Sequence, residues 1–491
     1  MKSIKNLLVP LIILICLTVF AIVYFAVDGI KNKQPSETTS GTVTVLTYES
    51  SDIASVKVVN QDNGYMSLVR CAQDSGKAVY SFEGDDFDPK EDYSQDKLFS
   101  YVNCLVTYYS NNKVSSDGNY AAYGLDTPRF VITIETSNGN SSTVYIGNKT
   151  PDGQQCYLYV EGSKDIYTVD ILKSFYASKN SLDFLAPVTL GVDYHELNAV
   201  HFDRKSDNLS LDTMVRITNS GIADFTIYKP YEHGTSGYFG TLIDAVVNTQ
   251  FTDFVDIKDS EFSEYGLSDP CYHFVFTRKD GTNSELYLSS LIDGYYYGYI
   301  KGNKKFFKIP EMAIEGLNLP ELILIDPYIC YSYVKDVSSI TGTYGDKSFK
   351  FNLDVREGSS IMAKDSTVEL DGRNAKISDS MGRAYCSVLF ESIACIKIGG
   401  IEMNPNTNTS VAPALSLTFI DKNYNTTVYA FYRRDDDSYY VFKNDEYMCF
   451  YVYATEIFKD GGADTYSYGY WKAYELLDEA IRNNTNGIYD F

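Results

Sequence analysis

The hexapeptide Tyr123-Gly124-Leu125-Asp126-Thr127-Pro128 returns as Tyr265-Gly266-Leu267-Ser268-Asp269-Pro270, and the chain is organised around these two copies. Glycine tolerates a positive φ and commonly ends a turn, whereas proline lacks an N–H group and fits the first residue of a strand. The pattern predicts a fixed corner with positive φ at each glycine. We interpret eight residues as structural markers of the corners: Tyr123, Gly124, Leu125, Pro128, Tyr265, Gly266, Leu267 and Pro270. Ligand binding by the two tyrosines is the alternative.

The strand pattern after each corner repeats in the same phase. The two corner prolines are 142 residues apart (270 − 128), and a further step of 143 residues (413 − 270) reaches Pro413. An apolar residue occupies every second position after each of these prolines, because a strand turns alternate side chains to the same face. The three sets are Phe130, Ile132 and Ile134; Tyr272, Phe274 and Phe276; and Leu415, Leu417 and Phe419. Such agreement is specific, since a slip of one residue would reverse the faces of the strand.

These repeats predict an α+β, β-dominated protein of three tandem units, each combining a hairpin-rich sheet with one or two helices. The expected units are residues 51–190, 191–330 and 331–491, the last divergent and closed by a C-terminal helix. A chain of 491 residues is too long for a single compact core, so the division agrees with the usual size of domains.

Three helices are predicted from apolar residues at helical spacing. Ser94 is the expected N-cap of the first and Ser378 that of the second, because serine oxygens accept hydrogen bonds from helix N-termini. The apolar residues of the three helices are Leu98, Val102, Leu105 and Val106; Val388, Leu389 and Ile393; and Trp471, Tyr474, Leu477 and Ile481.

The N-terminus predicts a membrane anchor. Residues 7–27 form a stretch of 21 residues without charge, which is long enough to cross a bilayer as a helix. A clear A-x-A cleavage site is missing, which favours an uncleaved signal anchor from Leu7 to Val27. We expect residues 1–6 in the cytoplasm, residues 28–50 as a flexible stalk, and the large C-terminal part outside a cell membrane that is crossed once.

Composition excludes some partners and leaves the disulfides open. The formal net charge of −23 argues against a general nucleic-acid-binding protein, because phosphates require a basic face. Of nine cysteines, Cys16 lies in the predicted anchor, and no C-x-x-C pair indicates a zinc site. We expect most of the other eight to be buried as small apolar side chains, with one or two disulfides as the alternative.

No sequence motif indicates catalysis, a cofactor or a metal site. The chain has four histidines and contains neither H-E-x-x-H, G-x-S-x-G, a Walker A sequence nor G-x-G-x-x-G. His195 and His201 lie six residues apart, on an expected loop and strand, and a solvent or core role is favoured over a ligand role. We therefore predict no catalytic, cofactor-binding or metal-binding residues.

Two further stretches each allow two interpretations. The acidic residues 85–92 lack the spacing of a calcium-binding loop, so a solvated turn is favoured over a weak calcium site. The run Tyr295-Tyr296-Tyr297-Gly298-Tyr299 is expected to be a strand with Tyr295, Tyr297 and Tyr299 on one face. Packing within the sheet is favoured there, and an aromatic surface for a glycan or peptide is the alternative.

The anchor, the stalk and the Tyr-Gly-Leu-x-x-Pro corners followed by hairpins resemble an uncharacterised bacterial family of membrane-anchored repeat proteins, a domain of unknown function. The resemblance covers about residues 50–330, and Tyr80 takes the place of the tryptophan usual in that family. It implies no catalytic residues. Members are often encoded beside ABC transporters of the gliding type, so the resemblance implies transporter subunits as candidate partners.

Together these observations predict a non-enzymatic, membrane-anchored extracytoplasmic accessory or binding protein, associated with an ABC transporter or a cell-envelope assembly. One alternative is a cell-envelope enzyme that acts on glycan or peptide, and another is a carbohydrate-binding surface module. The ligand is not specified by the sequence.

Overall fold

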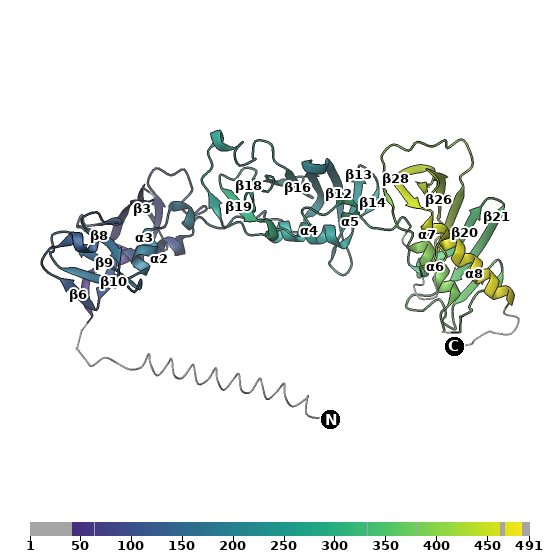
Figure 1. Ribbon diagram of the computed structural model, residues 1–491, viewed down its shortest axis with the longest axis horizontal. Coiled ribbons are helices and arrows are strands. Elements are labelled where there is room, and N and C mark those ends of the chain that lie inside the picture. Colours follow the sequence, from purple (N-terminus) through teal and green to yellow (C-terminus); the bar gives the residue numbers. More distant parts are fainter. Residues whose placement is uncertain (1–41, 63, 331, 381, 462–466, 484–491) are drawn as a thin grey trace, which may run out of the picture. The chain divides into compact units, whose positions relative to one another are not determined.

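The computed structural model describes residues 42–62, 64–330, 332–380, 382–461 and 467–483 (Figure 1). The predicted cytoplasmic segment 1–6 and the predicted anchor 7–27 lie outside the described residues. Within the described part, no helix has the length and apolar character needed to cross a membrane. Strands make up 42% of the structure and helices 19%, so the predicted β-dominated class is confirmed.

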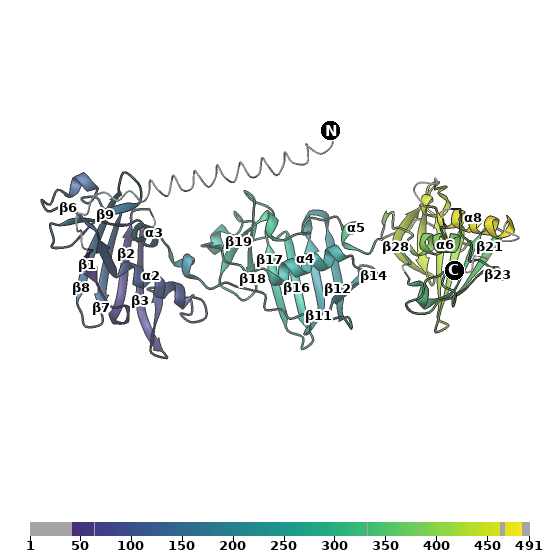
Figure 2. The same ribbon diagram turned by 90° about the horizontal axis from the view of Figure 1, so that it is seen from below.

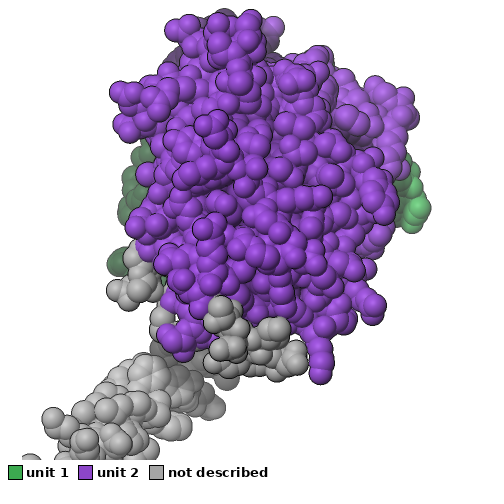
Figure 3. Space-filling model, turned by 90° about the vertical axis from the view of Figure 1, so that its right-hand side faces the viewer, with its two compact units in different colours: residues 1–186 green, residues 187–491 purple. Residues whose placement is uncertain are grey.

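The chain divides into two compact units, residues 1–186 and residues 187–491, which Figure 3 distinguishes by colour. The first unit contains one large antiparallel sheet and a separate strand pair, and the second contains two large antiparallel sheets. Residues 43–47, inside the segment expected to be a stalk, form strand β1 (Val43–Thr47) paired with β5 (Thr107–Ser110).

The first sheet has the strand order β4-β3-β2-β7-β8-β9-β10-β6. Its strands are β2 (Ile53–Asn60), β3 (Gly64–Asp74), β4 (Lys77–Phe82), β6 (Asn112–Ser115), β7 (Phe130–Thr136), β8 (Ser141–Lys149), β9 (Gln155–Val160) and β10 (Ile166–Asp170). The helices of this unit are α2 (Gln95–Leu105) and α3 (Leu172–Ala177).

The second sheet has the order β14-β13-β12-β11-β16-β17-β18-β19-β15. Its strands are β11 (Leu197–Arg204), β12 (Leu209–Ile217), β13 (Ala223–Lys229), β14 (His233–Gly234), β15 (Phe254–Val255), β16 (Tyr272–Arg278), β17 (Asn283–Leu288), β18 (Tyr295–Ile300) and β19 (Phe306–Pro310). The accompanying helices are α4 (Gly237–Asn248) and the short α5 (Glu321–Leu324).

The third sheet has the order β23-β22-β21-β20-β25-β26-β27-β28-β24. Its strands are β20 (Val337–Tyr344), β21 (Lys347–Asp354), β22 (Thr367–Leu370), β23 (Arg373–Asn374), β24 (Gly400–Ile401), β25 (Leu415–Asp421), β26 (Thr426–Arg433), β27 (Ser438–Lys443) and β28 (Glu446–Tyr453). Its helices are α6 (Tyr385–Ala394), α7 (Thr455–Phe458) and α8 (Tyr470–Asn483).

All three sheets follow one plan. A first meander, of three strands in the first sheet and four in the second and third, is joined through its first strand to a second meander of four. A short strand from between the two meanders pairs with the far edge of the second. The register is the same in the first two sheets: Val58 lies opposite Ile132 in one, and Phe202 lies opposite Phe274 in the other. The predicted alternation after each corner is confirmed, because these residues are buried while their neighbours are half-buried.

Each sheet buries one face beneath helices. In the second sheet α4 lies across the strands (Figure 2), and its buried side chains include Phe239, Leu242 and Ile243. This packing follows from the sequence of α4, whose apolar residues recur at three- and four-residue intervals. The opposite face of the second sheet carries the half-buried residues of the strands and is called the open face below.

The corners have the predicted backbone. Gly124 has φ 65° and Gly266 has φ 67°, so both lie in the left-handed region that favours glycine. Leu125 and Leu267 are buried beneath the corners. The two corner tyrosines pack on tyrosines of the third strand after the corner, with ring centroids 4.9 Å apart for Tyr123–Tyr157 and 4.8 Å apart for Tyr265–Tyr297.

Two details of the helix predictions need correction. Ser94 is the N-cap residue of α2, but its side chain makes no capping hydrogen bond. Ser378 does not cap a helix, because it forms a β-bridge with Ala384, and α6 begins only after that bridge, at Tyr385. The C-terminal helix is confirmed as α8, with Trp471 and Leu477 buried and Tyr474 and Ile481 half-buried.

The expectation that most cysteines are buried is wrong. Of the eight described cysteines only Cys156, Cys330 and Cys386 are buried, and all eight are free thiols. The other five lie at half-buried or exposed places of strands, helices and loops: Cys71 is exposed on β3, Cys104 is half-buried on α2, and Cys449 is half-buried at an irregular point of β28 with φ 65°.

Candidate functional site

The open face of the second sheet brings together two histidines and three carboxylates from four strands. His201 and Asp203 lie on β11, two residues apart, so both side chains leave the same face of the strand. The register places His273 of β16 opposite Asp203, and Asp212 of β12 opposite His201. Glu285 of β17 pairs with Val275, which makes it a diagonal neighbour of His273.

His201 is held between two carboxylates. Its Nε2 lies 2.7 Å from Oδ2 of Asp203, and its Nδ1 lies 2.6 Å from Oδ1 of Asp212. Asp212 also has a lysine neighbour, because Nζ of Lys229 is 3.8 Å from its other oxygen. Both ring nitrogens of His201 are therefore oriented by charged partners.

His273 continues the same row of polar side chains. Its Nδ1 is 3.9 Å from Oδ2 of Asp203, and its Nε2 is 3.4 Å from Oε2 of Glu285. Glu285 is fixed in turn, since the Tyr287 hydroxyl and the Lys301 ammonium group each donate a hydrogen bond to it at 2.7 Å. The row thus runs unbroken from β12 across β11 and β16 to β17.

The two histidines have opposite electrostatic tendencies. Burial lowers the pKa of His201, but hydrogen bonds and charge from Asp203 and Asp212 outweigh burial, so the net pKa is raised. Burial, together with the charge of His201, lowers the pKa of His273 despite the nearby carboxylates. When one ring of this pair is protonated, the other therefore tends to stay neutral.

Stacked aromatic rings extend the row toward the next strands. The ring of Tyr287 stacks on His273 at a centroid distance of 4.3 Å and lies 5.0 Å from the nearly parallel ring of Tyr299. Phe306 of β19 contacts Tyr299 edge to face at 5.8 Å. The open face therefore carries a continuous strip of polar and aromatic side chains, which we call the His–Tyr strip (His201, Asp203, Asp212, His273, Glu285, Tyr287 and Tyr299).

The tyrosine run of β18 has the faces expected from its sequence. Tyr296 is buried at 1% exposure on the helix-covered side, whereas Tyr295, Tyr297 and Tyr299 are half-buried on the other side. The hydroxyl of Tyr296 accepts a hydrogen bond from Asn318. Packing within the protein, the favoured interpretation, accounts for these contacts: Tyr299 stacks across strands on Tyr287, and Tyr297 packs on the corner residue Tyr265.

The acidic stretch 85–92 forms a turn, as expected. Asp88 accepts backbone hydrogen bonds from Lys90 and Glu91, and Asp85 accepts one from Phe87. These carboxylates therefore satisfy the backbone of the turn itself.

Sequence reasoning missed the pairing of His201 with His273. His195 is the histidine closest to His201 along the chain, but it lies in the turn before β11. The partner comes instead from β16, 72 residues later (273 − 201). The sequence does contain a relevant pattern. The alternation of β11 turns His201 and Asp203 outward together, and the alternation predicted after Pro270 turns His273 outward on β16.

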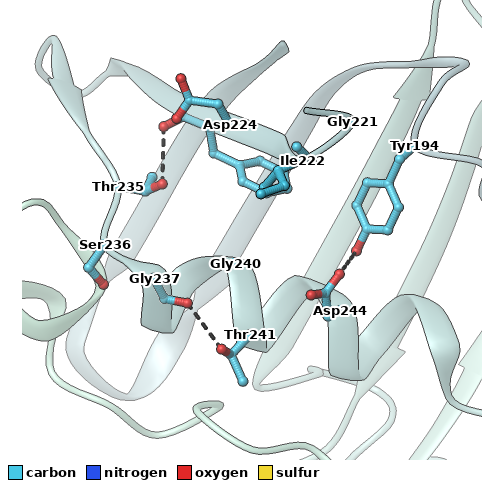
Figure 4. Close-up of a pocket in the computed structure, with 12 residues that line it drawn as sticks. Tyr194, Gly221, Ile222, Asp224, Thr235, Ser236, Gly237, Gly240, Thr241 and Asp244 are labelled. Carbon is cyan, nitrogen blue, oxygen red and sulfur yellow. Dashed lines mark hydrogen bonds between the residues drawn. The ribbon is translucent and has the colours of Figure 1, made fainter. Parts of the chain in front are cut away.

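A second feature is a hollow at the N-terminal end of α4, with a volume of about 510 Å³ (Figure 4). It lies between α4 and β13, where Gly237 and Gly240 leave room because they carry no side chain. Tyr194 closes one side by donating a hydrogen bond of 2.5 Å to Asp244. Three of the hydroxyl groups that line the hollow already serve the fold: Ser236 caps the helix by accepting from Tyr238, Thr241 donates to the Gly237 carbonyl oxygen, and Thr235 donates to the Phe225 carbonyl oxygen.

Comparison with known proteins finds one family. A family described as Domain of unknown function (DUF4340) matches residues 87–227, which include the first corner and end in β13. The matched stretch has 141 residues (227 − 87 + 1), close to the 142-residue step between the corners. No curated protein and no solved structure matches the chain. The match is consistent with the resemblance to an uncharacterised family.

Proposed function

We propose that this chain is a non-enzymatic, membrane-anchored binding protein that presents three tandem sheet-and-helix units outside the cell. In this proposal Leu7–Val27 is the single membrane span, and the units hold a partner in a transporter or cell-envelope assembly. The DUF4340 match carries no described activity, so the proposal depends on the architecture of the chain.

The observation that carries the proposal is the repetition of one strand order in three sheets. Repetition of a unit enlarges the surface of a protein without adding a new fold, and such surfaces commonly bind partners. Helices cover one face of the second sheet, so the opposite face is the one that can meet a partner. This reasoning favours binding over chemistry as the use of the chain.

Aromatic side chains recur on the outer faces of the first two sheets. Tyr145 stacks on Tyr159 at 4.6 Å in the first sheet, and Tyr287 stacks on Tyr299 at 5.0 Å in the second. These pairs occupy matching strands, and all four rings are half-buried. Half-exposed tyrosines suit interfaces because one end of the ring is apolar and the other is polar.

Subunits of an ABC transporter are the candidate partners, by the resemblance described above. The proposal requires contact either through the predicted span or through the units outside the membrane. It therefore predicts a complex that survives in mild detergent, together with exposure of the C-terminal part to protease added outside the cell.

The test is purification of the full chain from its native membrane in mild detergent, followed by identification of the proteins that accompany it. Recovery of transporter subunits in constant proportion would support the proposal. Recovery of the chain alone would remove the proposed partner. Protection of the whole C-terminal part from external protease would overturn the proposed orientation.

The stacked tyrosines also favour a second candidate, a glycan-binding surface. Sugar rings stack on exposed aromatic rings, and two units offer such rings at matching positions. Retention of the full chain on insoluble cell-wall glycan, reduced by the pair Tyr159→Ala and Tyr299→Ala, would support it. Hydrolysis of that glycan, abolished by a single Asp or Glu substitution, would instead identify an enzyme.

A further inference from the structure

Three side chains of the His–Tyr strip have the donor atoms and the spacing of a metal site. They are His201, Asp203 and His273, whose ligand atoms all lie within 4.8 Å of one another. They offer two imidazole nitrogens and one carboxylate oxygen, a donor set that binds zinc and related divalent ions. From this arrangement we propose that His201, Asp203 and His273 bind a divalent transition-metal ion of the zinc class.

The backbone brings the three donors together without an exposed loop. His201 and Asp203 leave the same face of β11, and His273 faces Asp203 across the pair β11–β16. Adjacent strands of a sheet are rigid relative to one another, so the positions of the Cβ atoms are fixed before any ion arrives. The cost of assembling the site is therefore small.

Two of the three donor–donor separations are close to those of a tetrahedral site, and all three lie within 4.8 Å. Oδ2 of Asp203 is 2.7 Å from Nε2 of His201 and 3.9 Å from Nδ1 of His273. Donors at about 2.0 to 2.2 Å from a tetrahedral ion are separated by about 3.3 to 3.5 Å. One separation must lengthen and the other must shorten, each by less than about 1 Å.

The outer nitrogens of both histidines already have the partners that metal-binding histidines use. Nδ1 of His201 lies 2.6 Å from Asp212, and Nε2 of His273 lies 3.4 Å from Glu285. A carboxylate on the far nitrogen fixes the ring and makes the inner nitrogen a better ligand. A chance cluster of two histidines and an aspartate would not be expected to provide this support to both rings.

The site would leave one coordination position for water or a partner. The three side chains are 26% to 37% exposed, so an ion there would be reached from solvent. Three protein ligands with an open fourth position can also bridge to a carboxylate or imidazole of a second molecule. The inference thus adds a specific ligand class to the open face and does not depend on the proposed transporter.

The experiment uses the full chain in mild detergent, carrying an affinity tag without histidine and stripped of metal with a chelator. Zn²⁺ is titrated by calorimetry, and Co²⁺ serves as a spectroscopic probe because tetrahedral sites give it strong visible absorption. We expect one Zn²⁺ per chain and a Co²⁺ spectrum that Zn²⁺ abolishes. Asp203→Asn and His273→Asn should each weaken Zn²⁺ binding at least about tenfold, and Glu285→Gln by about tenfold.

The matched control is His195→Asn, which changes a histidine in the turn before β11 and should leave affinity unchanged. A second measurement needs no variant: Zn²⁺ should protect His201 and His273, but not His195, from diethylpyrocarbonate. The proposal is overturned if Zn²⁺ gives no such protection in the unaltered chain. It is equally overturned if Asp203→Asn and His273→Asn bind Zn²⁺ as tightly as the unaltered chain.

Discussion

The first and second sheets share a register but differ on their outward faces. On the buried side Val56 and Ile134 pair in the first sheet as Val200 and Phe276 pair in the second. On the outward side the same register places different residues, among them the three proposed metal ligands. His201, Asp203 and His273 of the second sheet correspond to Lys57, Val59 and Val131 of the first.

This difference shows at which positions the repeated unit tolerates a change of residue. A buried position must remain apolar and of similar volume, because cavities and buried charges destabilise a sheet. An outward position lacks that constraint and can acquire charged or metal-binding side chains. In the third sheet the corresponding residues are Thr341, Thr343 and Ser416, so the histidine cluster belongs to the second sheet.

The largest effect is expected when the second sheet receives the outward residues of the first. The triple variant His201→Lys, Asp203→Val and His273→Val should weaken Zn²⁺ binding by at least about a hundredfold. The free energy of unfolding should change by only about 1 kcal/mol, because the first sheet tolerates these residues at the same register. Calorimetry and denaturant unfolding measure the two quantities. Unchanged Zn²⁺ affinity would show that the comparison has no bearing on metal binding.

A second contrast concerns two arginines next to the corners of their units. Arg204 is the last residue of β11, and Arg129 directly precedes β7. Arg204 is 3% exposed and donates hydrogen bonds to Asp207 and to the carbonyl oxygens of Leu317 and Leu319. In the first unit Arg129 meets Asp62 at 2.8 Å, but both side chains are about half exposed.

Arg204→Ala should therefore cost about 2 to 4 kcal/mol, because it leaves buried carbonyl groups without donors. Arg129→Ala should cost less than about 1 kcal/mol, as exposed ion pairs usually do. Denaturant unfolding of both variants checks the difference. Equal costs would mean that burial does not distinguish the two arginines.

Residues with strong local constraints made much of this fold predictable. The corner glycines, the prolines and the alternating apolar residues of β7 and β16 each depend on rules that act within a few residues. The short edge strands β6 and β15 were not predicted, because they contain only four and two residues and exist through pairing with β10 and β19. What makes these residues strands is the neighbouring strand, and that strand lies far away in the sequence.

The metal cluster escaped prediction for a related reason. Metal motifs are recognised in sequence by short spacings, whereas His201 and His273 meet through the register of β11 and β16. The two core residues Phe202 and Phe274, each next to one histidine, fix that register. Asp203 and His273 can be placed side by side from the sequence only when the outward residues of β11 and β16 are combined with the register of the two strands.

Valine substitutions at the two corner glycines compare the backbone strain of the two corners. A Cβ atom on Gly124 would lie 2.6 Å from the Asn148 side chain, whereas one on Gly266 would lie 3.1 Å from Cβ of Ser289. Both residues also have positive φ, so valine at either position should cost about 1 to 3 kcal/mol. Gly266→Val should be the more costly, as measured by denaturant unfolding, because Cβ of the buried Ser289 is fixed by its backbone, whereas the end of the exposed Asn148 side chain can rotate away. A cost below about 0.5 kcal/mol at both would contradict a strained corner.

The histidines allow a pH test that separates the two compact units. All four lie between residues 195 and 273, so residues 1–186 have none. Burial lowers the pKa of His233 below its ordinary value of 6.5, and its Nε2 lies 2.8 Å from the Asp326 carbonyl oxygen. The unfolded chain therefore binds a proton at His233 more readily than the folded chain, and stability falls as pH drops through 6.5 toward the lower folded pKa.

We expect His233→Gln to reduce the loss of stability of the second unit between about pH 7.5 and about pH 5.5. Thermal unfolding of the full chain at several pH values measures this slope for the variant and the unaltered chain. Identical slopes would mean that His233 does not contribute. A steeper slope in the variant would mean that its folded pKa is raised.

The smallest effects should come from the stacked tyrosines, which compare the two outward faces directly. Tyr145 and Tyr159 are 4.6 Å apart with nearly parallel rings, and Tyr287 and Tyr299 are 5.0 Å apart with a similar arrangement. Double-mutant cycles with alanine should give a coupling of about 0.5 to 1 kcal/mol for each pair, since both are cross-strand aromatic contacts.

The single substitutions should differ, because Tyr287 also donates to Glu285 and stacks on His273, whereas Tyr145 has only a 3.4 Å contact with Glu161. Tyr287→Ala should therefore destabilise its unit by more than Tyr145→Ala does, as measured by denaturant unfolding. If the two single variants are equally costly, Tyr287 does not support the histidine cluster, and the difference between the two outward faces does not extend to their stacked tyrosines.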